Sequence, residues 1–416
     1  MGKVIALAVK NLLRYKRRTL LTGLLITVGV VAVIVFSGLS GSFKQAIVGQ
    51  ITDSMLSHLQ VHRKGYLASI DNLPLDRMIP PQAFEKLSML LAQTPGVAAV
   101  SPRIKFGAML SNYAQTTNVR LNGVDPAKEA LAVPLLAARI QSPVHSDRLF
   151  QKGEVLLPEL LAKGMAVKTG DTVVLVANNK DGSVNGMTFV VAGLVESLMG
   201  PGGRDGYLHI EDAAVLLRME ALEISEVAVR AADFDGLGTL SQRLRQGLEP
   251  MAGNAGKPIF EVHTWDQLTP FYNVVRMIDL MTLGIKAILI AVVLISVLNV
   301  MMMSVYERVR EIGTLAAMGT RPGRIMTLFV AEGFCLGLFS ALAGAGIGSG
   351  TLFILRLKGV SVAFGGANQV FVLSPGVSPG EVASACLIVL AVSVLASLQP
   401  AAKASRLEPV EALRHV

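Results

Sequence analysis

The chain has 416 residues, of which 52% are hydrophobic and only 16% are charged, with a formal net charge of +8. Soluble globular proteins carry about 25% charged residues, so this composition excludes an ordinary soluble protein and predicts membrane-embedded segments. The basic residues cluster beside apolar segments, which favours membrane orientation over nucleic-acid binding. Both cysteines, Cys335 and Cys386, lie in apolar runs, so neither a disulfide framework nor a metal site is expected there.

Four apolar stretches are long enough to cross a bilayer, which takes about 20 residues in a helix. They are Thr19–Phe43, Ala287–Tyr306, Ile325–Leu355 and Val382–Ala402. The first is too long for the ~7–15-residue core of a signal peptide, so a retained anchor is expected. A fifth uncharged run, Gly359–Gly380, is rich in glycine and proline, which suits a loop or a short surface helix rather than a span.

Lysine and arginine predict the orientation, because they are enriched in cytoplasmic loops. They gather before the first span, after the second span and in the tail, as Lys3, Lys10, Arg14, Lys16, Arg17, Arg18, Arg308, Arg310, Arg321, Arg324, Lys403, Arg406 and Arg414. Both termini are therefore predicted to be cytoplasmic. The predicted parts are a cytoplasmic amphipathic segment (1–18), a first membrane helix (19–42), an outer stalk and α+β domain (43–275, with an insert at about 125–219), a second membrane helix (276–306), a cytoplasmic helix and loop (307–324), a third membrane helix (325–356), an outer loop (357–381), a fourth membrane helix (382–400) and a cytoplasmic tail (401–416).

The outer segment contains two similar strand–helix–strand patterns. Periodicity predicts a stalk helix over Phe43–Met55 and a strand over Leu56–Val61. An amphipathic helix follows at Pro81–Gln93, with proline near its start. Further strands and helices are predicted at Val97–Val100, Thr117–Val124, Ile224–Arg230, Asp235–Leu248 and Ile259–Val262. The repeated pattern suggests an internal duplication around the insert.

Within the insert, strands at Thr172–Ala177 and Met187–Val195 are joined by a turn-rich hairpin, Asn178–Gly186. Before the second span, Trp265–Asp279 has helical spacing and predicts a second stalk helix. Glycines of the third span, among them Gly333, predict close approach of a neighbouring helix.

No catalytic constellation stands out. Gly253–Pro258 is the nearest approach to a phosphate-binding loop, but its glycine spacing is wrong and no Ser or Thr follows Lys257. This chain is therefore not expected to hydrolyse ATP. His58 and His62 stand four apart, as metal ligands on a helix would; on the predicted strand they instead line a solvated face with Gln60, and no metal site is expected.

Two polar residues inside the spans are candidate functional residues, because polar groups in a bilayer are costly. Glu332 would either gate a conformational change or make a structural contact between helices, and the sequence leaves both open. Asn299 is expected to hydrogen-bond between helices. Lys286, at the outer end of the second span, can extend to the interface.

The loop after the second span reads as a short amphipathic helix. Ile312, Leu315 and Met318 are spaced to form an apolar edge, and Gly319 ends the helix. The residues around that edge include Glu307, Arg308, Arg310, Glu311 and Gly313. A solvated surface loop and a helix that docks in a partner's groove both fit this pattern.

Three segments carry a family resemblance. They are SVYERVREIGTLAAMGTRPGRI (304–325), QPAAKASRLEPVEALR (399–414) and KNLLRYKRRT (10–19). Together they resemble the signatures of FtsX/MacB/LolC-type ABC transporter permeases. Span order and the position of the outer domain match as well, so the resemblance covers the whole chain.

The resemblance implies a membrane α-helical protein with four transmembrane helices and an α+β extracytoplasmic domain with Porter-like and Sabre-like parts. Its expected function is to transmit ATP-driven motion of a separate ATPase subunit to the periplasmic domain, for lipoprotein release or trafficking or export of a periplasmic substrate. The chain would not be an enzyme and would hold no cofactor, since the partner ATPase binds ATP and Mg. The implied ATPase-coupling residues are Glu307, Arg308, Arg310, Glu311, Ile312, Gly313, Leu315, Met318 and Gly319.

The implied location is a bacterial inner membrane. The implied partners are an ABC ATPase, a second permease copy or paralogue, membrane lipid, and a periplasmic adaptor or lipoprotein, with no nucleic acid. Family members that recruit a lipoprotein chaperone carry an apolar hook, whereas the Asn178–Gly186 hairpin is polar and glycine-rich. A membrane-anchored sensor or cell-envelope regulator is the alternative, although the cytoplasmic parts are short for a signalling output domain.

Overall fold

The computed structural model describes residues 2–14, 16–144, 148–198, 204–251, 258–363, 370–376 and 378–407. The chain divides into a helical unit, Met1–Ala46 with Val275–Val416, and an α/β unit, Ile47–Val274. The glycine-rich segment 253–257 and the end of the closing motif, 408–414, lie outside the described residues.

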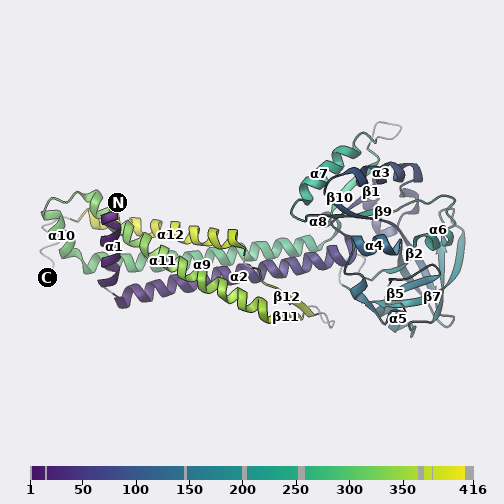
Figure 1. Cartoon of the computed structure of the whole chain (residues 1–416), viewed down its shortest axis with the longest axis horizontal. Coiled ribbons are helices and arrows are strands. Elements are labelled where there is room, and N and C mark those ends of the chain that lie inside the picture. Colours follow the sequence, from purple (N-terminus) through teal and green to yellow (C-terminus); the bar gives the residue numbers. More distant parts are fainter. Residues whose placement is uncertain are drawn as a thin grey trace. The chain divides into compact units, whose positions relative to one another are not determined.

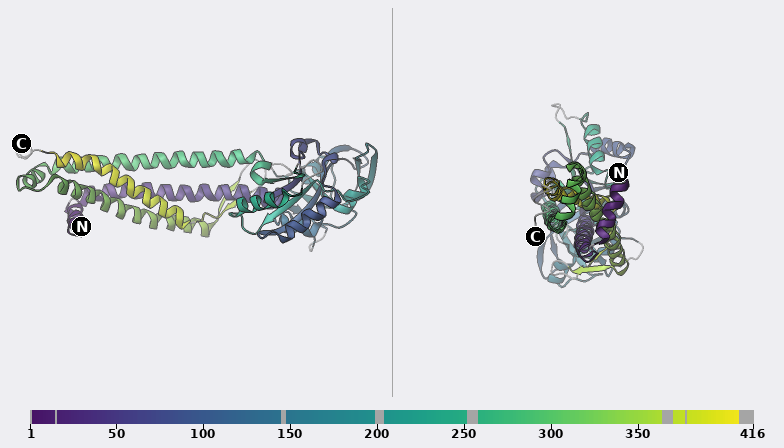
Figure 2. Two further views of the ribbon diagram at one scale, coloured as in Figure 1. Left: turned by 90° about the horizontal axis from the view of Figure 1, so that it is seen from above. Right: turned by 90° about the vertical axis from the view of Figure 1, so that its left-hand side faces the viewer.

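The helical unit is built from long helices that run side by side (Figures 1 and 2). Its elements are α1 (Gly2–Arg14), α2 (Lys16–Ile51), α9 (Phe271–Glu307), α10 (Val309–Ala317), α11 (Pro322–Lys358) and α12 (Pro379–Ser405). Four of them, α2, α9, α11 and α12, are long and apolar enough to cross a membrane, which confirms the four predicted spans. Because no charged residue interrupts most of these runs, hydrocarbon can replace water around them.

Glycines allow α11 and α12 to pack closely, as predicted. A Cβ atom on Gly333 would lie 2.6 Å from Cβ of Ser397, and one on Gly337 would lie 2.6 Å from Cβ of Ser393. Any larger side chain at either glycine would therefore push the two helices apart.

Two predictions about the ends of the spans need correction. The Gly359–Gly380 run is not a span, but it contains an antiparallel strand pair, β11 (Val360–Ala363) and β12 (Val370–Leu373), rather than a helix or simple loop. The predicted helix Trp265–Asp279 is broken: α8 (Trp265–Leu268) ends before α9 begins. Thr269 is extended, with φ −140° and ψ 138°, because it precedes Pro270.

In the α/β unit, the two predicted strand–helix–strand patterns are confirmed and interleave. The first is β1 (Leu59–Arg63), α3 (Pro81–Gln93) and β2 (Val97–Ser111), and the second is β9 (Glu226–Ala231), α7 (Leu237–Leu248) and β10 (Phe260–Thr264). The strand order β10-β1-β9-β2 is antiparallel throughout. This is the strand order of a ferredoxin-like βαββαβ unit. The stalk helix before β1 is also confirmed, since α2 continues into a π-helical turn, η1 (Thr52–Leu56).

The insert extends the same sheet. The strand β3 (Thr116–Val124) leads into it. Its elements are α4 (Pro126–Ala132), η4 (Ala137–Arg139), β4 (Ile140–Gln141), β5 (Glu154–Pro158), α5 (Glu159–Gly164), β6 (Thr172–Asn178), β7 (Val184–Val195), β8 (Gly206–His209) and α6 (Ile210–Leu216). The link between β1 and α3 contains η2 (Leu67–Asn72) and η3 (Leu75–Arg77). The long strand β2 joins both parts, because it pairs with β9 near its start and with β3 and β6 further along. The predicted β6–β7 hairpin is confirmed.

The predicted solvated face of β1 is wrong, because His58, Gln60 and His62 are all buried. β1 lies between β9 and β10, so both of its edges are paired. The polar groups find partners inside: Gln60 Nε2 donates to the Leu56 carbonyl at 3.0 Å, and the Ala231 amide donates to His58 Nδ1 at 3.1 Å. No group of three or more metal-ligating side chains occurs among the described residues.

A buried ionic cluster fixes β2 against its neighbours. Arg103 contacts Glu129 at 2.7 Å and Glu226 at 3.0 Å, and Lys105 Nζ lies 3.1 Å from Glu226. Burial alone would raise the pKa of Glu226, but Lys105, His62 and Arg103 hold that pKa well below its ordinary value. Two cations therefore balance two carboxylates inside the α/β unit.

Candidate functional site

The segment between the second and third spans, residues 307–324, is called the coupling segment below. α9 ends at Glu307, Arg308 leaves the helical conformation with φ −111° and ψ 16°, and α10 follows. Gly319 ends α10 with φ +84°. The Gly319 amide donates to the Ala316 carbonyl and the Thr320 amide to the Leu315 carbonyl, which is a Schellman motif that favours glycine at that position.

α10 has one buried face and one exposed face. Ile312 is buried and packs in a cluster with Val305, Ile325 and Phe329 of the adjoining spans. Arg310, Thr314 and Ala317 are exposed on α10, and Met318, the residue after its end, is 70% exposed. The buried face attaches α10 to the helical unit, and the exposed face is available to a partner.

The predicted coupling residues divide between these faces. The buried or half-buried members are Arg308, Glu311, Ile312, Gly313 and Leu315. The exposed members are Glu307, Arg310, Met318 and Gly319. The prediction that Ile312, Leu315 and Met318 form one continuous apolar edge is wrong. Ile312 is buried in the helical unit, whereas Met318 is exposed to solvent. A short helix held on one side cannot expose all three.

Glu332 is the centre of a polar network that ties the coupling segment to two helices. It stands on α11, is 2% exposed, and accepts hydrogen bonds from Arg308 Nη1 at 2.9 Å and Asn11 Nδ2 at 2.6 Å. Arg308 comes from the start of the coupling segment, and Asn11 comes from α1. The carboxylate thus joins three chain segments that are distant in sequence.

Glu311 extends this network toward solvent. It accepts from Arg308 Nε at 3.2 Å and from Arg14 Nη1 at 2.9 Å. Arg308 also lies over the Phe329 ring, 5.7 Å from its centroid. Burial alone would lower the pKa of Arg308, but Glu332 and Glu311 raise it above its ordinary value. Arg308 therefore stays charged, and the network holds its geometry by opposite charges.

The sequence did not point to Asn11 or Arg14 as members of this network. Their only signal was a position on the amphipathic helix α1, which does not reveal a partner hundreds of residues away. Asn299, in contrast, was grouped with Glu332 as an intramembrane polar site, and the structure separates them. Asn299 is exposed on α9 and does not line the small cavity of about 30 Å³ beside Glu332.

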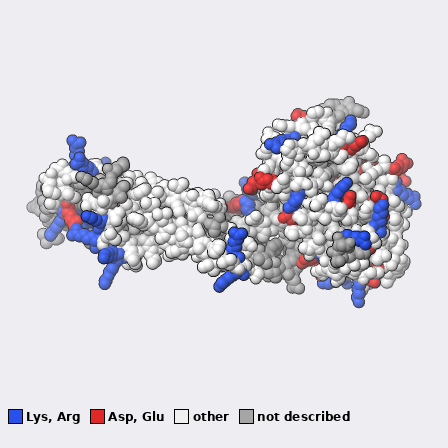
Figure 3. Space-filling model, viewed as in Figure 1, with Lys and Arg blue, Asp and Glu red and all other residues white. Residues whose placement is uncertain are grey.

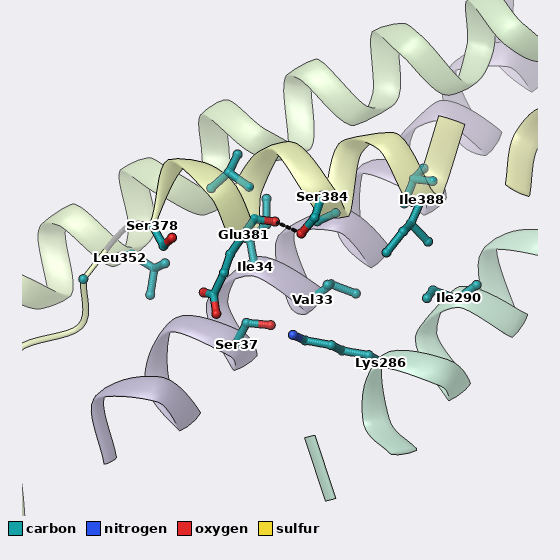
Figure 4. A pocket seen from close by; sticks show the side chains of 14 residues that line it. Val33, Ile34, Ser37, Lys286, Ile290, Leu352, Ser378, Glu381, Ser384 and Ile388 are labelled. Atoms are coloured by element: carbon teal, nitrogen blue, oxygen red, sulfur yellow. Dashed lines mark hydrogen bonds between the residues drawn. The ribbon is translucent and has the colours of Figure 1, made fainter. Parts of the chain in front are cut away.

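A crevice between α2, α9 and α12 contains a second group of polar side chains. Figure 4 shows Lys286 of α9 extending toward Ser37 of α2 and Glu381 of α12. Its walls are apolar side chains such as Val33 and Ile388. The cavity volume is about 50 Å³.

Comparison with known proteins agrees with this architecture. The MacB-like periplasmic core domain matches residues 19–246, more than half of the chain, and the FtsX-like permease C-terminal region matches residues 283–409. The lipoprotein-releasing system transmembrane protein LolC of Neisseria meningitidis is 25% identical, over 94% of this chain and 92% of that protein. The macrolide export ATP-binding/permease protein MacB 1/2 of Paracoccus denitrificans is 25% identical over 100% of this chain, which spans 59% of that protein.

Among solved structures, the periplasmic region of MacB from Actinobacillus actinomycetemcomitans matches with a TM-score of 0.36 and 15% identity, covering 56% of this chain and 95% of that one. The four apolar helices make this chain a multi-pass membrane protein. With both family regions in the expected order, the chain belongs to the LolC/MacB/FtsX-type family of ABC transporter permeases.

Proposed function

We propose that this chain transmits ATP-driven motion from a separate ATPase subunit to its periplasmic domain, in a bacterial inner membrane. The observation that supports this most is the construction of the coupling segment. One face of α10 is free for docking, while Glu332 and Arg308 attach the other face to the membrane helices. A docked subunit that moves α10 would therefore move α1 and α11 with it. ATP and Mg would be bound by that subunit, and this chain would carry no cofactor.

The distribution of charge supports an orientation with both termini in the cytoplasm. Lysine and arginine gather at one end of the helical unit, and uncharged side chains cover the length beside it (Figure 3). The described basic residues at that end include Lys10, Arg14, Lys16, Arg17, Arg308, Arg310, Arg321, Arg324, Lys403 and Arg406. Because such residues stay on the cytoplasmic side, the coupling segment faces the compartment that contains ATP.

The substrate would be handled by the α/β unit outside the membrane, as lipoprotein release or as export of a periplasmic substrate. LolC is named for lipoprotein release and MacB for macrolide export. The β6–β7 hairpin is polar at its tip, and Lys180 there pairs with Glu223 at 2.9 Å. A polar tip favours a periplasmic partner with a polar surface. A second permease copy or a paralogue would complete the complex.

The test substitutes the exposed face of α10. Met318→Asp places a charge on the docking face without touching the Glu332 network, and Met89→Asp makes the same change on α3, where Met89 is 54% exposed. We expect Met318→Asp to reduce co-purification of an ABC ATPase subunit, and Met89→Asp to leave it unchanged. Equal recovery of the ATPase with both variants would contradict docking at α10.

A further inference from the structure

Two opposite charges face the crevice between α2, α9 and α12 without forming an ion pair. Lys286 of α9 and Glu381 of α12 both line it, and Figure 4 shows their charged ends directed into the same space. Among the described residues, neither side chain has a hydrogen bond or an ion pair. Ser37 of α2 lies beside them and is only 6% exposed, and its hydroxyl has no partner in the described part of the chain either.

A neighbouring ion pair shows how α2 and α9 behave where opposite charges can meet. Lys44 of α2 and Asp279 of α9 are 2.9 Å apart. Lys286 lies two helical turns further along the same face of α9. It finds no acidic residue on α2, whose sequence has none, and it does not pair with Glu381 of α12. A group that satisfies both Lys286 and Glu381 therefore needs an anion at one end and a cation at the other.

Both charges lie at the level of lipid headgroups. The stretch of α9 from Lys286 to Glu307 is about 32 Å long, and the stretch of α12 from Glu381 to Lys403 is about 33 Å long, at 1.5 Å per residue. Each length is close to the thickness of the hydrocarbon core, about 30 Å. With Glu307 and Lys403 at one boundary of the hydrocarbon, Lys286 and Glu381 lie at the opposite one.

The crevice can be reached from outside the bundle. Ile388 lines it and is 45% exposed. Its volume of about 50 Å³ exceeds the roughly 10–15 Å³ that one water needs by several-fold. A short polar arm of a ligand therefore has room between Lys286 and Glu381, while the apolar remainder of that ligand lies outside, against Ile388.

We infer that this crevice binds the headgroup of an ethanolamine phospholipid. The phosphate contacts Lys286 and Ser37, and the primary ammonium contacts Glu381. A primary ammonium donates charge-assisted hydrogen bonds to a carboxylate, whereas the quaternary ammonium of a choline phospholipid has no hydrogen to donate. Glu381 also stands in the first turn of α12, where the helix dipole favours a negative charge. That effect explains a carboxylate at this position, but not its direction toward an unpaired lysine.

The experiment measures which lipid stays on the purified full chain. The chain is placed in nanodiscs with equal amounts of phosphatidylethanolamine and phosphatidylcholine that carry the same acyl chains. Native mass spectrometry then counts the lipids that remain bound after release. The wild type should retain phosphatidylethanolamine about 3- to 10-fold more than phosphatidylcholine, the range for one hydrogen bond. Equal retention of the two lipids would overturn the inference.

Substitutions assign each contact. Glu381→Gln should remove the preference and leave retention of phosphatidylcholine unchanged, whereas Glu381→Asp keeps the charge and should keep the preference. Lys286→Met should lower the retention of both lipids, because both carry the phosphate. Lys358→Met is the control, since Lys358 is exposed at the end of α11 and does not line the crevice. A wild-type preference in Glu381→Gln, or a lost preference in Lys358→Met, would reject the crevice as the site.

Soluble phosphoethanolamine distinguishes a lipid from a free zwitterion. It should not displace the bound lipid, because it lacks the acyl chains that lie against Ile388. Displacement would assign the site to the free zwitterion and overturn the inference. A direct ion pair between Lys286 and Glu381 in the membrane is the remaining alternative, and the wild type would then show no preference between the two lipids. None of these readouts uses an ATPase, so their failure leaves the docking of a partner at α10 untouched.

Discussion

Replacing Glu332 with alanine should release the coupling segment from α1. Glu332 is 2% exposed and Arg308 is 8% exposed, and their contact is 2.9 Å. Removing one partner of a buried ion pair destabilises by about 3–5 kcal/mol, because the other charge stays buried and unpaired. Arg308 keeps its contact with Glu311 at 3.2 Å, so we expect the lower end of that range, about 3 kcal/mol. Asn11 loses its acceptor at the same time.

A change of about 3 kcal/mol alters the ratio of attached to detached segment by about 150-fold. Hydrogen exchange of the purified full chain in lipid nanodiscs measures this ratio directly, because amides exchange when a segment opens. In Glu332→Ala, peptides from α1 and α10 should exchange faster, while peptides from β2 should not change. Glu332→Gln should have a smaller effect, because its amide oxygen can still accept a hydrogen bond.

The Glu332→Ala/Arg308→Ala double variant separates the ion pair from simple packing. It leaves no unpaired charge, so its effect should be smaller than the sum of the two single effects. Wild-type exchange of α1 and α10 in Glu332→Ala would refute the view that this carboxylate holds the segment. Full additivity in the double variant would show that the pair is not coupled.

Two further predictions concern the buried cluster of the α/β unit. Glu226→Gln removes one of the two carboxylates that neutralise Arg103 and Lys105. It should lower the free energy of unfolding of the α/β unit by about 3–5 kcal/mol. An unchanged thermal midpoint in calorimetry would contradict this. Because the pKa of Glu226 is lowered from its ordinary value of 4.5, its contribution is complete above about pH 4.5 and is lost as pH falls below that value. Denaturant unfolding measured from pH 7 to pH 3 should therefore show that the free energy of unfolding falls more steeply with acid in the wild type than in Glu226→Gln. Parallel curves for the two proteins would show that the ionisation of Glu226 does not cause the acid destabilisation.

The elements predicted correctly from the sequence are those that are determined by residues close together in the chain. The four spans were predictable because long uncharged apolar runs are unfavourable in water. The helix α3 was predictable because its apolar residues have helical spacing and a proline stands at its first position. The β6–β7 hairpin follows from turn residues, with Gly182 at φ +82°. In each case the residues that decide the structure lie within one segment of the chain.

The elements that it predicted wrongly depend on contacts between distant segments. Alternation along β1 indicates two faces, but not that a sheet with β9 and β10 would bury His62 on the face expected to be solvated. Arg308 looks like a surface charge until α11 places Glu332 within 2.9 Å. The partner of Asn11 is 321 positions away. No local pattern contains that information, because the cost of burying each group depends on a partner chosen by the fold.

The Glu332 network also bears on why a carboxylate stands in a membrane helix. A well-packed hydrophobic side chain at the same position would often be as stable or more stable than a buried ion pair, so stability alone is a weak reason for it. What the pair supplies is geometry, because Arg308 satisfies Glu332 in one arrangement and leaves both groups buried and unpaired in others. A packed apolar contact could slide by a fraction of a turn at little cost, and the displacement of α10 would then be lost before it reached α11. A polar joint resists that sliding, and the proposed transmission of motion from an ATPase through α10 would require this property.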